Sequence, residues 1–417
     1  MLRLDFIRLF CKDLVAMEKL SMSTLALLPF MAAAQLPSVG KFASSPDEWL
    51  LSNGQAWHHH TGTAPTVAPL IFRGPRDAEK AVVDKAQSLF EHSSAKGMAL
   101  LDGNQVVWMA YKPPASPSKR FLSFSIGKTV TAMAVGKAIC EGKLSLNQAI
   151  SQVIPELAST DLGAATVRDL LKMSSGTWQG NPDSTIVNAE QDQRLRSGAM
   201  NYLDLLVTQK VNSAERDFAG LARKPGDYFM YRSTDPLALG VALNKATGTP
   251  YAKYVEREVL LAAGIERSGI IGQDRSGYGA SDGNVRLFLE DWLRFAVWVK
   301  SNESGTGCFS DYVRQASTRQ IPNVAKKSGL AFDGYGYLTW TDNLQRRDSY
   351  WAVGHGGQRI GWNHANARIL VAFSNVENYM PALYALYAEW AAMGDVPTSK
   401  QNALSKESLS PTPLQAR

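Results

Sequence analysis

Cysteine is scarce in this chain of 417 residues, which has only Cys11, Cys140 and Cys308. The three do not stand at the spacing of a metal site, and a disulfide between Cys140 and Cys308 cannot be inferred from the sequence. The run His58–His60 has no carboxylate or cysteine at ligand spacing, which favours an exposed loop. We therefore expect no metal site.

Long runs of one charge are also missing. The formal net charge is +6, but lysine and arginine are spread along the chain without basic-aromatic repeats. This distribution argues against a nucleic-acid partner. The hydrophobic content of 45% and charged content of 20% instead describe a chain that can bury a sizeable core.

No apolar run is long enough to span a bilayer comfortably. The longest candidate, residues 20–33, follows Lys19 and ends in Ala32–Ala34, where a signal peptidase could cut. We expect a signal peptide over residues 1–34, no stable membrane span, and a periplasmic or secreted protein. The alternative is an N-terminal helix that packs on the domain, in which case the protein would be cytoplasmic. The stretch before Lys19 is longer and more acidic than the start of a usual signal peptide, which also leaves open a start at Met17 or Met22.

The remaining chain alternates between strand-rich ends and a helical middle. We expect an irregular arm over residues 35–74, a sheet domain over 75–150 and 280–394, a helical subdomain over 151–279, and a disordered tail over 395–417. This order predicts an α/β (α+β) fold: an antiparallel sheet flanked by helices, built from both chain ends, with an inserted all-helical subdomain. A small ligand would bind between the two parts.

One stretch, residues 120–143, suggests two different chemistries. Gly127-Lys128-Thr129 imitates the end of a nucleotide-binding P-loop. That loop needs another glycine five positions before Gly127, so that backbone N–H groups can approach the phosphates, and this position is Leu122. The P-loop interpretation is therefore rejected.

The second chemistry uses Ser125 and Lys128, which share one face if a helix begins at the serine. A serine hydroxyl needs a base to remove its proton, and a buried lysine can serve because burial lowers its pKa. The Ser125 N–H at the helix start would be free to stabilise an oxyanion. The alternative is a structural lysine at a helix start.

The Ser-x-x-Lys spacing alone does not single out Ser125, because other serines share it. The same Ser-x-x-Lys spacing occurs at Ser38/Lys41, Ser93/Lys96 and Ser116/Lys119. Only Ser125 heads a long helix of apolar and small residues. Gly279-Ala280-Ser281-Asp282-Gly283 matches the G-x-S-x-G elbow of α/β-hydrolases, but the segment before it is too polar for the buried strand that the elbow requires.

Three motifs in order resemble the serine β-lactamase and penicillin-binding-protein superfamily, especially its class C-like branch of family VIII esterases and 6-aminohexanoate-dimer hydrolases. Ser125-Ile126-Gly127-Lys128 is similar to the Ser-x-x-Lys motif, Tyr231-Arg232-Ser233 to the Tyr-x-Asn or Tyr-x-Ser motif, and His355-Gly356-Gly357 to the Lys-Thr-Gly or His-x-Gly motif. The resemblance covers roughly residues 75–390.

The resemblance implies catalytic roles. Ser125 would be acylated, Lys128 would hold or accept its proton, and Tyr231 would pass that proton to the leaving group. The backbone N–H groups of Ser125 and Gln358 would form the oxyanion hole. The fold family requires no metal and no organic cofactor. The residues expected to contact substrate are Ser233, His355, Gly356, Gly357 and Trp178.

Two departures from the family pattern bear on the substrate. His355 replaces a lysine that would face a substrate carboxylate, and Ser233 replaces an asparagine amide donor. Both favour a small-molecule ester or small linear amide over a penicillin-type substrate. The leading hypothesis is therefore a serine hydrolase that forms an acyl-enzyme. The alternatives are a β-lactamase or D-Ala carboxypeptidase and a non-catalytic binding or scaffolding protein, and the oligomeric state stays open.

Overall fold

The computed structural model describes residues 56–60, 69–177, 189–208, 223–324 and 329–395. These residues belong to one compact unit that spans residues 37–417. The expected signal peptide and Trp178 lie outside the described residues, as does the expected tail except for its first residue. Within the described ranges, no helix is long and apolar enough to cross a membrane.

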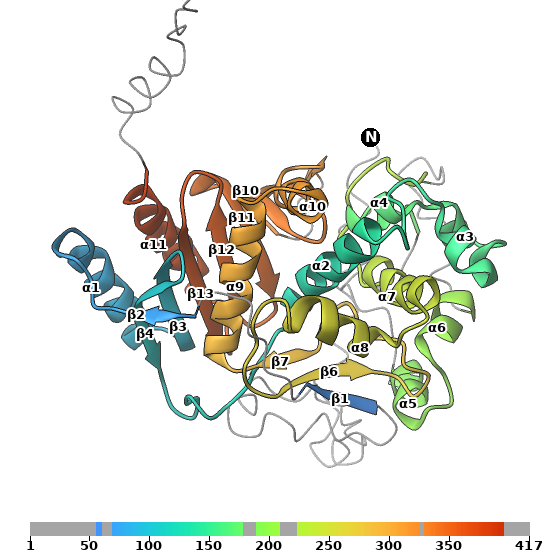
Figure 1. The fold of residues 1–417 in the computed structure, drawn as a ribbon, viewed down its shortest axis with the longest axis horizontal. Coiled ribbons are helices and arrows are strands. Elements are labelled where there is room, and N and C mark those ends of the chain that lie inside the picture. Colours follow the sequence, from blue (N-terminus) through green and yellow to red (C-terminus); the bar gives the residue numbers. More distant parts are fainter. Residues whose placement is uncertain (1–55, 61–68, 178–188, 209–222, 325–328, 396–417) are drawn as a thin grey trace, which may run out of the picture. The chain divides into compact units, whose positions relative to one another are not determined.

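The main sheet has nine strands in the order β2-β4-β3-β13-β12-β11-β10-β9-β8 (Figure 1). Neighbours run antiparallel except for β2 and β4, which are parallel. Its strands are β2 (Ile71–Phe72), β3 (Ala95–Asp102), β4 (Gln105–Tyr111), β8 (Ile321–Pro322), β9 (Phe332–Tyr335), β10 (Trp340–Asn343), β11 (Arg346–Gly354), β12 (Gln358–Asn363) and β13 (Arg368–Ser374). Because β13 pairs with β3, the two chain ends meet inside the sheet, which confirms the predicted fold class.

Helices cover both faces of this sheet, as alternate side chains of its strands show. On one face, the Trp351 ring of β11 packs edge-on against Tyr384 and Tyr387 of α11. On the other, the Trp362 ring of β12 stacks on Tyr350 and donates its indole N–H to the backbone of α9. This double cover explains why β12 and β13 are buried along their whole length.

The α-helices follow one another along the chain as Figure 1 shows. They are α1 (Asp77–His92), α2 (Ile126–Cys140), α3 (Ile150–Val153), α4 (Val167–Leu171), α5 (Ala189–Ser197), α6 (Tyr202–Thr208), α7 (Thr234–Thr247), α8 (Tyr251–Val255), α9 (Leu289–Glu303), α10 (Cys308–Ser317) and α11 (Met380–Ala392). Short 3-10 turns span Pro155–Leu157 and Asp161–Ala164, and a π-helical turn spans Glu256–Leu260.

A second, four-stranded sheet, in the order β1-β6-β7-β5, lies outside the sequence predictions. Its strands are β1 (Ala56–His60), β5 (Phe121–Leu122), β6 (Gly269–Gln273) and β7 (Val285–Leu287). The region expected to be all-helical therefore also contributes β6, and the arm expected to be irregular contributes β1 and β2. These strands are too short to show an alternating pattern, and partners distant in the chain stabilise them.

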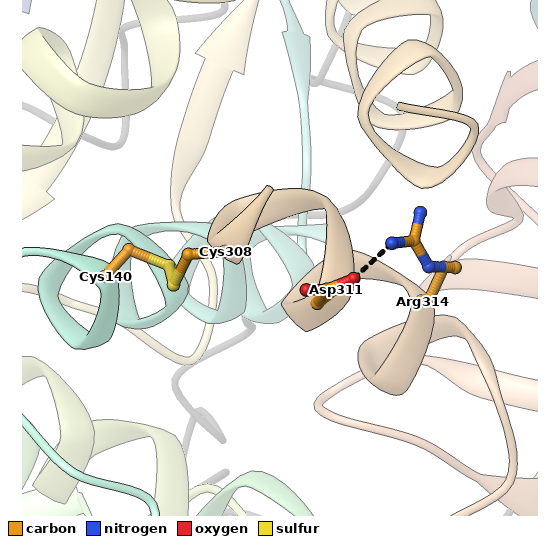
Figure 2. Close-up of a disulfide and its surroundings, with 4 residues drawn as sticks. All are labelled: Cys140, Cys308, Asp311 and Arg314. Carbon is orange, nitrogen blue, oxygen red and sulfur yellow. Dashed lines mark hydrogen bonds and ion pairs between the residues drawn. A yellow bond between two sulfur atoms is a disulfide. The ribbon is translucent and has the colours of Figure 1, made fainter. Parts of the chain in front are cut away.

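Helix α2 crosses the interior and is buried on almost every side. Gly136 allows a close approach here, because a Cβ atom at this position would meet the Tyr312 ring of α10 at 2.3 Å. The end of α2 is joined to the start of α10 by a disulfide between Cys140 and Cys308 (Figure 2). The structure thus supplies the pairing that the sequence left open.

Candidate active site

The turn between β5 and α2 sets the position of Ser125. Ser123 anchors the turn to β7 through two hydrogen bonds with Val285, of 2.8 and 3.0 Å. Phe124 then adopts a φ of 42°, a left-handed conformation that bulky residues rarely take and that stores strain at functional sites. Ser125 follows as the N-cap of α2. Within the described residues its backbone N–H donates to no protein oxygen, as expected at a helix start.

Lys128 contacts this serine from one turn further along α2. Its Nζ donates to Ser125 Oγ at 2.9 Å and to the carbonyl oxygen of Asp282 at 2.6 Å. The lysine is 3% exposed. A buried amine at hydrogen-bond distance from a serine hydroxyl has the geometry that a proton acceptor for that serine needs.

Gly127, between the two, lets α2 approach the loop that carries Asp282. A Cβ atom on Gly127 would meet the backbone of Gly283 at 2.7 Å. A glycine is therefore required here by close packing against a neighbouring backbone, and it has no part in phosphate binding. The contact keeps the Asp282 carbonyl within reach of Lys128.

Tyr231 lies beside the lysine, just before α7. Lys128 Nζ is 5.2 Å from the centroid of its ring, which is a cation–π contact. The Trp340 ring, which also lines the cavity, stacks on Tyr231 with the ring centroids 5.3 Å apart. This packing fixes the plane of the phenol, and Tyr231 and Ser125 line the same cavity.

The third motif, His355-Gly356-Gly357, forms the turn between β11 and β12. Gly356 and Gly357 have φ values of 75° and 95°, which other residues rarely adopt. The exposed His355 ring meets the Phe124 ring edge-on at 5.6 Å. The third motif therefore occupies a hairpin turn directly beside the turn that precedes Ser125.

Gln358 starts β12 immediately after this turn. Its buried side chain donates to the His355 carbonyl at 2.7 Å and accepts from the Ser374 N–H at 3.0 Å. Gly354 pairs with Gln358 from β11 and lies close to the turn between β5 and α2. A Cβ atom on Gly354 would meet the Ser123 carbonyl oxygen at 2.4 Å. The hairpin and the serine turn are therefore held against each other. The role of the Gln358 N–H in an oxyanion hole stays a prediction.

A cavity of about 560 Å³ opens in front of these groups. Of the predicted site residues, Ser125, Tyr231 and His355 line it. Ser233 caps α7 and is buried, and neither it nor the two glycines of the third motif is among the lining residues. Ser233, Gly356 and Gly357 as substrate contacts therefore stay predictions, and Trp178 lies outside the described residues.

The rival serines occupy unsuitable environments. Ser281 is fully buried, and its hydroxyl donates to the Pro236 carbonyl at 2.8 Å. The Ser93 hydroxyl turns back to the end of α1, and Ser116 pairs with Ser118. Ser38 lies outside the described residues. Of the described Ser-x-x-Lys pairs, only Ser125 and Lys128 are hydrogen-bonded to each other.

Asp235, near the start of α7, is a buried carboxylate that was not predicted from the sequence. It accepts from the Ser175 hydroxyl at 2.5 Å and from the Ser175 N–H at 3.2 Å. Arg232 donates to the Thr177 carbonyl nearby. Burial raises the pKa of Asp235 to about 6, although Arg232 and Ser175 act in the opposite direction. The segment that carries Tyr231 is thus tied to Ser175 and Thr177.

This raised pKa predicts a pH-dependent stability. Since folding favours the protonated carboxyl, Asp235 stabilises the fold below its ordinary pKa of 3.8, and this contribution is lost as the pH rises through about 6. Between pH 4 and 7, the wild type should lose about 2–3 kcal/mol of unfolding free energy relative to Asp235→Asn. Urea titrations at several pH values measure this difference. The exposed Asp77→Asn variant is the control. If the free energy of unfolding changed with pH by the same amount in the wild type and in Asp235→Asn, the prediction would be contradicted.

No group of three or more His, Cys, Asp or Glu residues in the described ranges could hold a metal ion. The strand β1 contains His58–His60, whose side chains are not described. Ser125 and Tyr231 line the cavity, and Lys128 is hydrogen-bonded to Ser125. Such a set can carry out acyl transfer by nucleophilic attack and proton transfer.

Comparison with known proteins identifies the family of the chain. The family model described as Beta-lactamase matches residues 86–392. A 6-aminohexanoate-dimer hydrolase of Paenarthrobacter ureafaciens is 23% identical over 208 residues, which are 49% of this chain and 51% of that protein. The chain thus matches about half the length of this relative.

Two solved structures show the same fold. The octameric penicillin-binding protein homologue from Pyrococcus abyssi has a TM-score of 0.57 at 19% identity, covering 77% of this chain and 78% of its own. EstCE1, described as a hydrolase with promiscuous acyltransferase activity, has a TM-score of 0.58 at 16% identity, covering 75% and 98%. Because the family model spans more than half of the residues, the chain belongs to the beta-lactamase family, within the serine β-lactamase and penicillin-binding-protein superfamily that its three motifs predicted.

Proposed function

We propose that the protein is a serine hydrolase that forms an acyl-enzyme at Ser125 and acts on short esters or small linear amides. The observation that carries the proposal is the 2.9 Å hydrogen bond between Lys128 Nζ and Ser125 Oγ, at the start of a buried helix and beside Tyr231. The name hydrolase, which both a curated relative and a solved structure carry, supports the reaction class.

In the proposed reaction, Ser125 Oγ attacks the substrate carbonyl carbon while its proton passes to Lys128 or Tyr231. The bond to the alcohol or amine breaks as that proton reaches the leaving group. Water then attacks the acyl-enzyme, giving a proton to the same groups, and the acid is released as Ser125 regains its proton. The developing oxyanion would be stabilised by the N–H groups of Ser125 and Gln358. No step needs a metal or cofactor.

An activity panel tests this proposal. Wild type and Ser125→Ala are given p-nitrophenyl acetate and butyrate, small linear amides, and nitrocefin. We expect turnover of an ester or amide by the wild type and its loss in the variant. Fast nitrocefin turnover without ester hydrolysis would favour the β-lactamase or D-Ala carboxypeptidase alternative. Turnover of no substrate by either folded protein would favour a non-catalytic binding protein.

We also propose a periplasmic or secreted location. The disulfide between Cys140 and Cys308 supports it, because such bonds persist in oxidising compartments and are rare in the cytosol. Fractionation of cells that express the full chain tests the location. Recovery of the protein in the cytoplasm with free thiols would contradict it.

A further inference from the structure

The hairpin turn between β11 and β12 is built mostly from glycine. Of its three residues, Gly356 and Gly357 have φ values of 75° and 95°, and Gly354 ends the strand before it. Glycine loses more conformational freedom on folding than any other residue. A turn of this composition therefore needs contacts from outside it to keep a fixed position beside Ser125.

Arg359 supplies such contacts on the hairpin itself. Its Nη1 donates to the carbonyl oxygens of Gly354 at 2.8 Å and Gln358 at 2.9 Å. These two residues pair directly across the hairpin, so one nitrogen joins both strands where the turn begins and ends. The rigid, planar guanidinium holds its donors at fixed angles, which a flexible lysine ammonium does not.

The other nitrogens of Arg359 fasten the hairpin to the start of α11. Its Nε donates to the Tyr384 hydroxyl at 2.8 Å, and its Nη2 lies 3.5 Å from Glu377 Oε2. The Tyr384 ring is held in turn by the rings of Phe332 and Trp351, at 5.6 and 5.0 Å between centroids. Arg359 is only 4% exposed, and burying a charge is costly unless it is paired and hydrogen-bonded. The arginine thus acts as a buried brace between the hairpin and α11.

The braced hairpin packs against the turn that carries the candidate nucleophile. A Cβ atom on Gly354 would meet the carbonyl oxygen of Ser123, the residue that anchors the turn before Ser125, at 2.4 Å. Gln358, whose N–H is the second donor of the proposed oxyanion hole, directly follows the hairpin turn. A shift of the hairpin would therefore move this donor relative to Ser125 Oγ.

We propose that Arg359 is a positioning residue, which acts through the Gly354 and Gln358 carbonyls to hold the hairpin where the reaction at Ser125 requires it. The inference rests on the proposed serine hydrolase function. Because a misplacement of about 1 Å can cost about 100-fold in rate, loss of the brace should lower kcat. KM should change little, since the brace acts on the geometry of the transition state.

Kinetics of two Arg359 variants on p-nitrophenyl butyrate test the proposal. Arg359→Ala should lower kcat by about 10- to 100-fold, with KM within about threefold of the wild type. Arg359→Lys keeps the charge but not the planar donors, so it should retain only part of the lost rate. Because Arg359 lines the cavity, added guanidinium ion should enter the space left in Arg359→Ala and raise its kcat. Equal, non-denaturing concentrations of sodium chloride or urea should not.

Phenylboronic acid separates positioning from a loss of folded protein. Its boron adds to a serine hydroxyl and places an oxygen where the oxyanion develops, so its inhibition constant reports the geometry around Ser125. We expect this constant to rise about tenfold or more in Arg359→Ala. A variant that is merely less stable would have fewer active molecules, and these would bind the boronic acid as the wild type does.

Arg314→Ala is the matched control. Arg314 Nη1 also donates to two carbonyl oxygens, those of Glu303 at 3.0 Å and Gly305 at 2.7 Å, but this arginine is not among the residues that line the cavity. The variant should keep the kcat and the inhibition constant of the wild type. Tyr384→Phe covers the case in which Arg359→Ala does not fold, because it removes only the hydroxyl that accepts from Arg359 Nε. It should lower kcat by a smaller factor than Arg359→Lys does, again with little change in KM.

The outcomes distinguish this inference from the function on which it rests. If the wild type hydrolyses the ester and Ser125→Ala does not, the hydrolase function stands. The positioning inference is then wrong if folded Arg359→Lys and Tyr384→Phe keep the kcat and the inhibition constant of the wild type, or if Arg314→Ala loses as much as the Arg359 variants. If the folded wild type hydrolyses no ester, both fail.

Discussion

A Lys128→Met variant is expected to lose about 100- to 10,000-fold in kcat on ester substrates, with a small change in KM. Methionine fills a similar volume but cannot accept the proton of Ser125, whose Oγ lies 2.9 Å from Lys128 Nζ in the wild type. Steady-state kinetics with p-nitrophenyl butyrate measure the loss. We expect kcat to fall and KM to stay nearly unchanged, because the Lys128 amine acts on bond making and not on substrate binding.

A second buried lysine supplies the control for this prediction. Lys300 of α9 is 7% exposed and is held by Glu303 and by the carbonyl of Asn363, away from the cavity lining. Lys300→Met should lower stability while keeping kcat close to that of the wild type. If Lys128→Met retained kcat within about threefold, or if both variants lost it equally, Lys128 would be a structural lysine.

Removing the disulfide with a Cys140→Ala/Cys308→Ala double variant is expected to lower the free energy of unfolding by about 3–5 kcal/mol. The bond closes a loop with a sequence separation of 168 residues, so its loss frees a large part of the unfolded chain. It also fastens the far end of α2, the helix that begins beside Ser125, to α10 (Figure 2).

Guanidinium denaturation with and without dithiothreitol measures this effect. The wild type should become less stable when reduced, and the double variant should not respond to the reductant. The ion pair between Asp311 and Arg314 lies beside the bond on α10 and stays intact in the double variant. A wild type that is indifferent to reduction would show that the disulfide contributes nothing to stability.

Much of the fold could be predicted because its signals are local. The strand-rich ends of the chain predicted one sheet built from both ends, and β3 pairs with β13 accordingly. The second sheet could not be predicted, since β5 and β7 have two and three residues and depend on partners far away in the chain. The disulfide likewise depends on a packing of α2 against α10 that no local pattern encodes.

For the candidate site, the sequence placed Ser125 and Lys128 on one helix face, and the structure brings them into contact. The position of Tyr231 beside Lys128 came from the resemblance alone. Spacing could not reveal the strained φ of Phe124 or the support that Asp282 gives through its backbone carbonyl. Backbone groups carry no sequence signature, so such contributions appear only in three dimensions.

Arg359 and Glu377, which line the cavity, were not predicted for a related reason. Arg359 follows the third motif closely, but no local pattern marks it as a lining residue. Glu377 belongs to a segment between β13 and α11 with no recognisable motif. Their meeting depends on how the hairpin packs against the start of α11, which is a tertiary property.

Covalent labelling tests the central claim most directly. The folded wild type is incubated with a fluorophosphonate probe, digested, and the modified peptide is identified by mass spectrometry. We predict one label on Ser125, slower labelling in Lys128→Met, and none in Ser125→Ala. A label on Ser281, or no label on any serine of the folded protein, would contradict the assignment of Ser125 as the nucleophile.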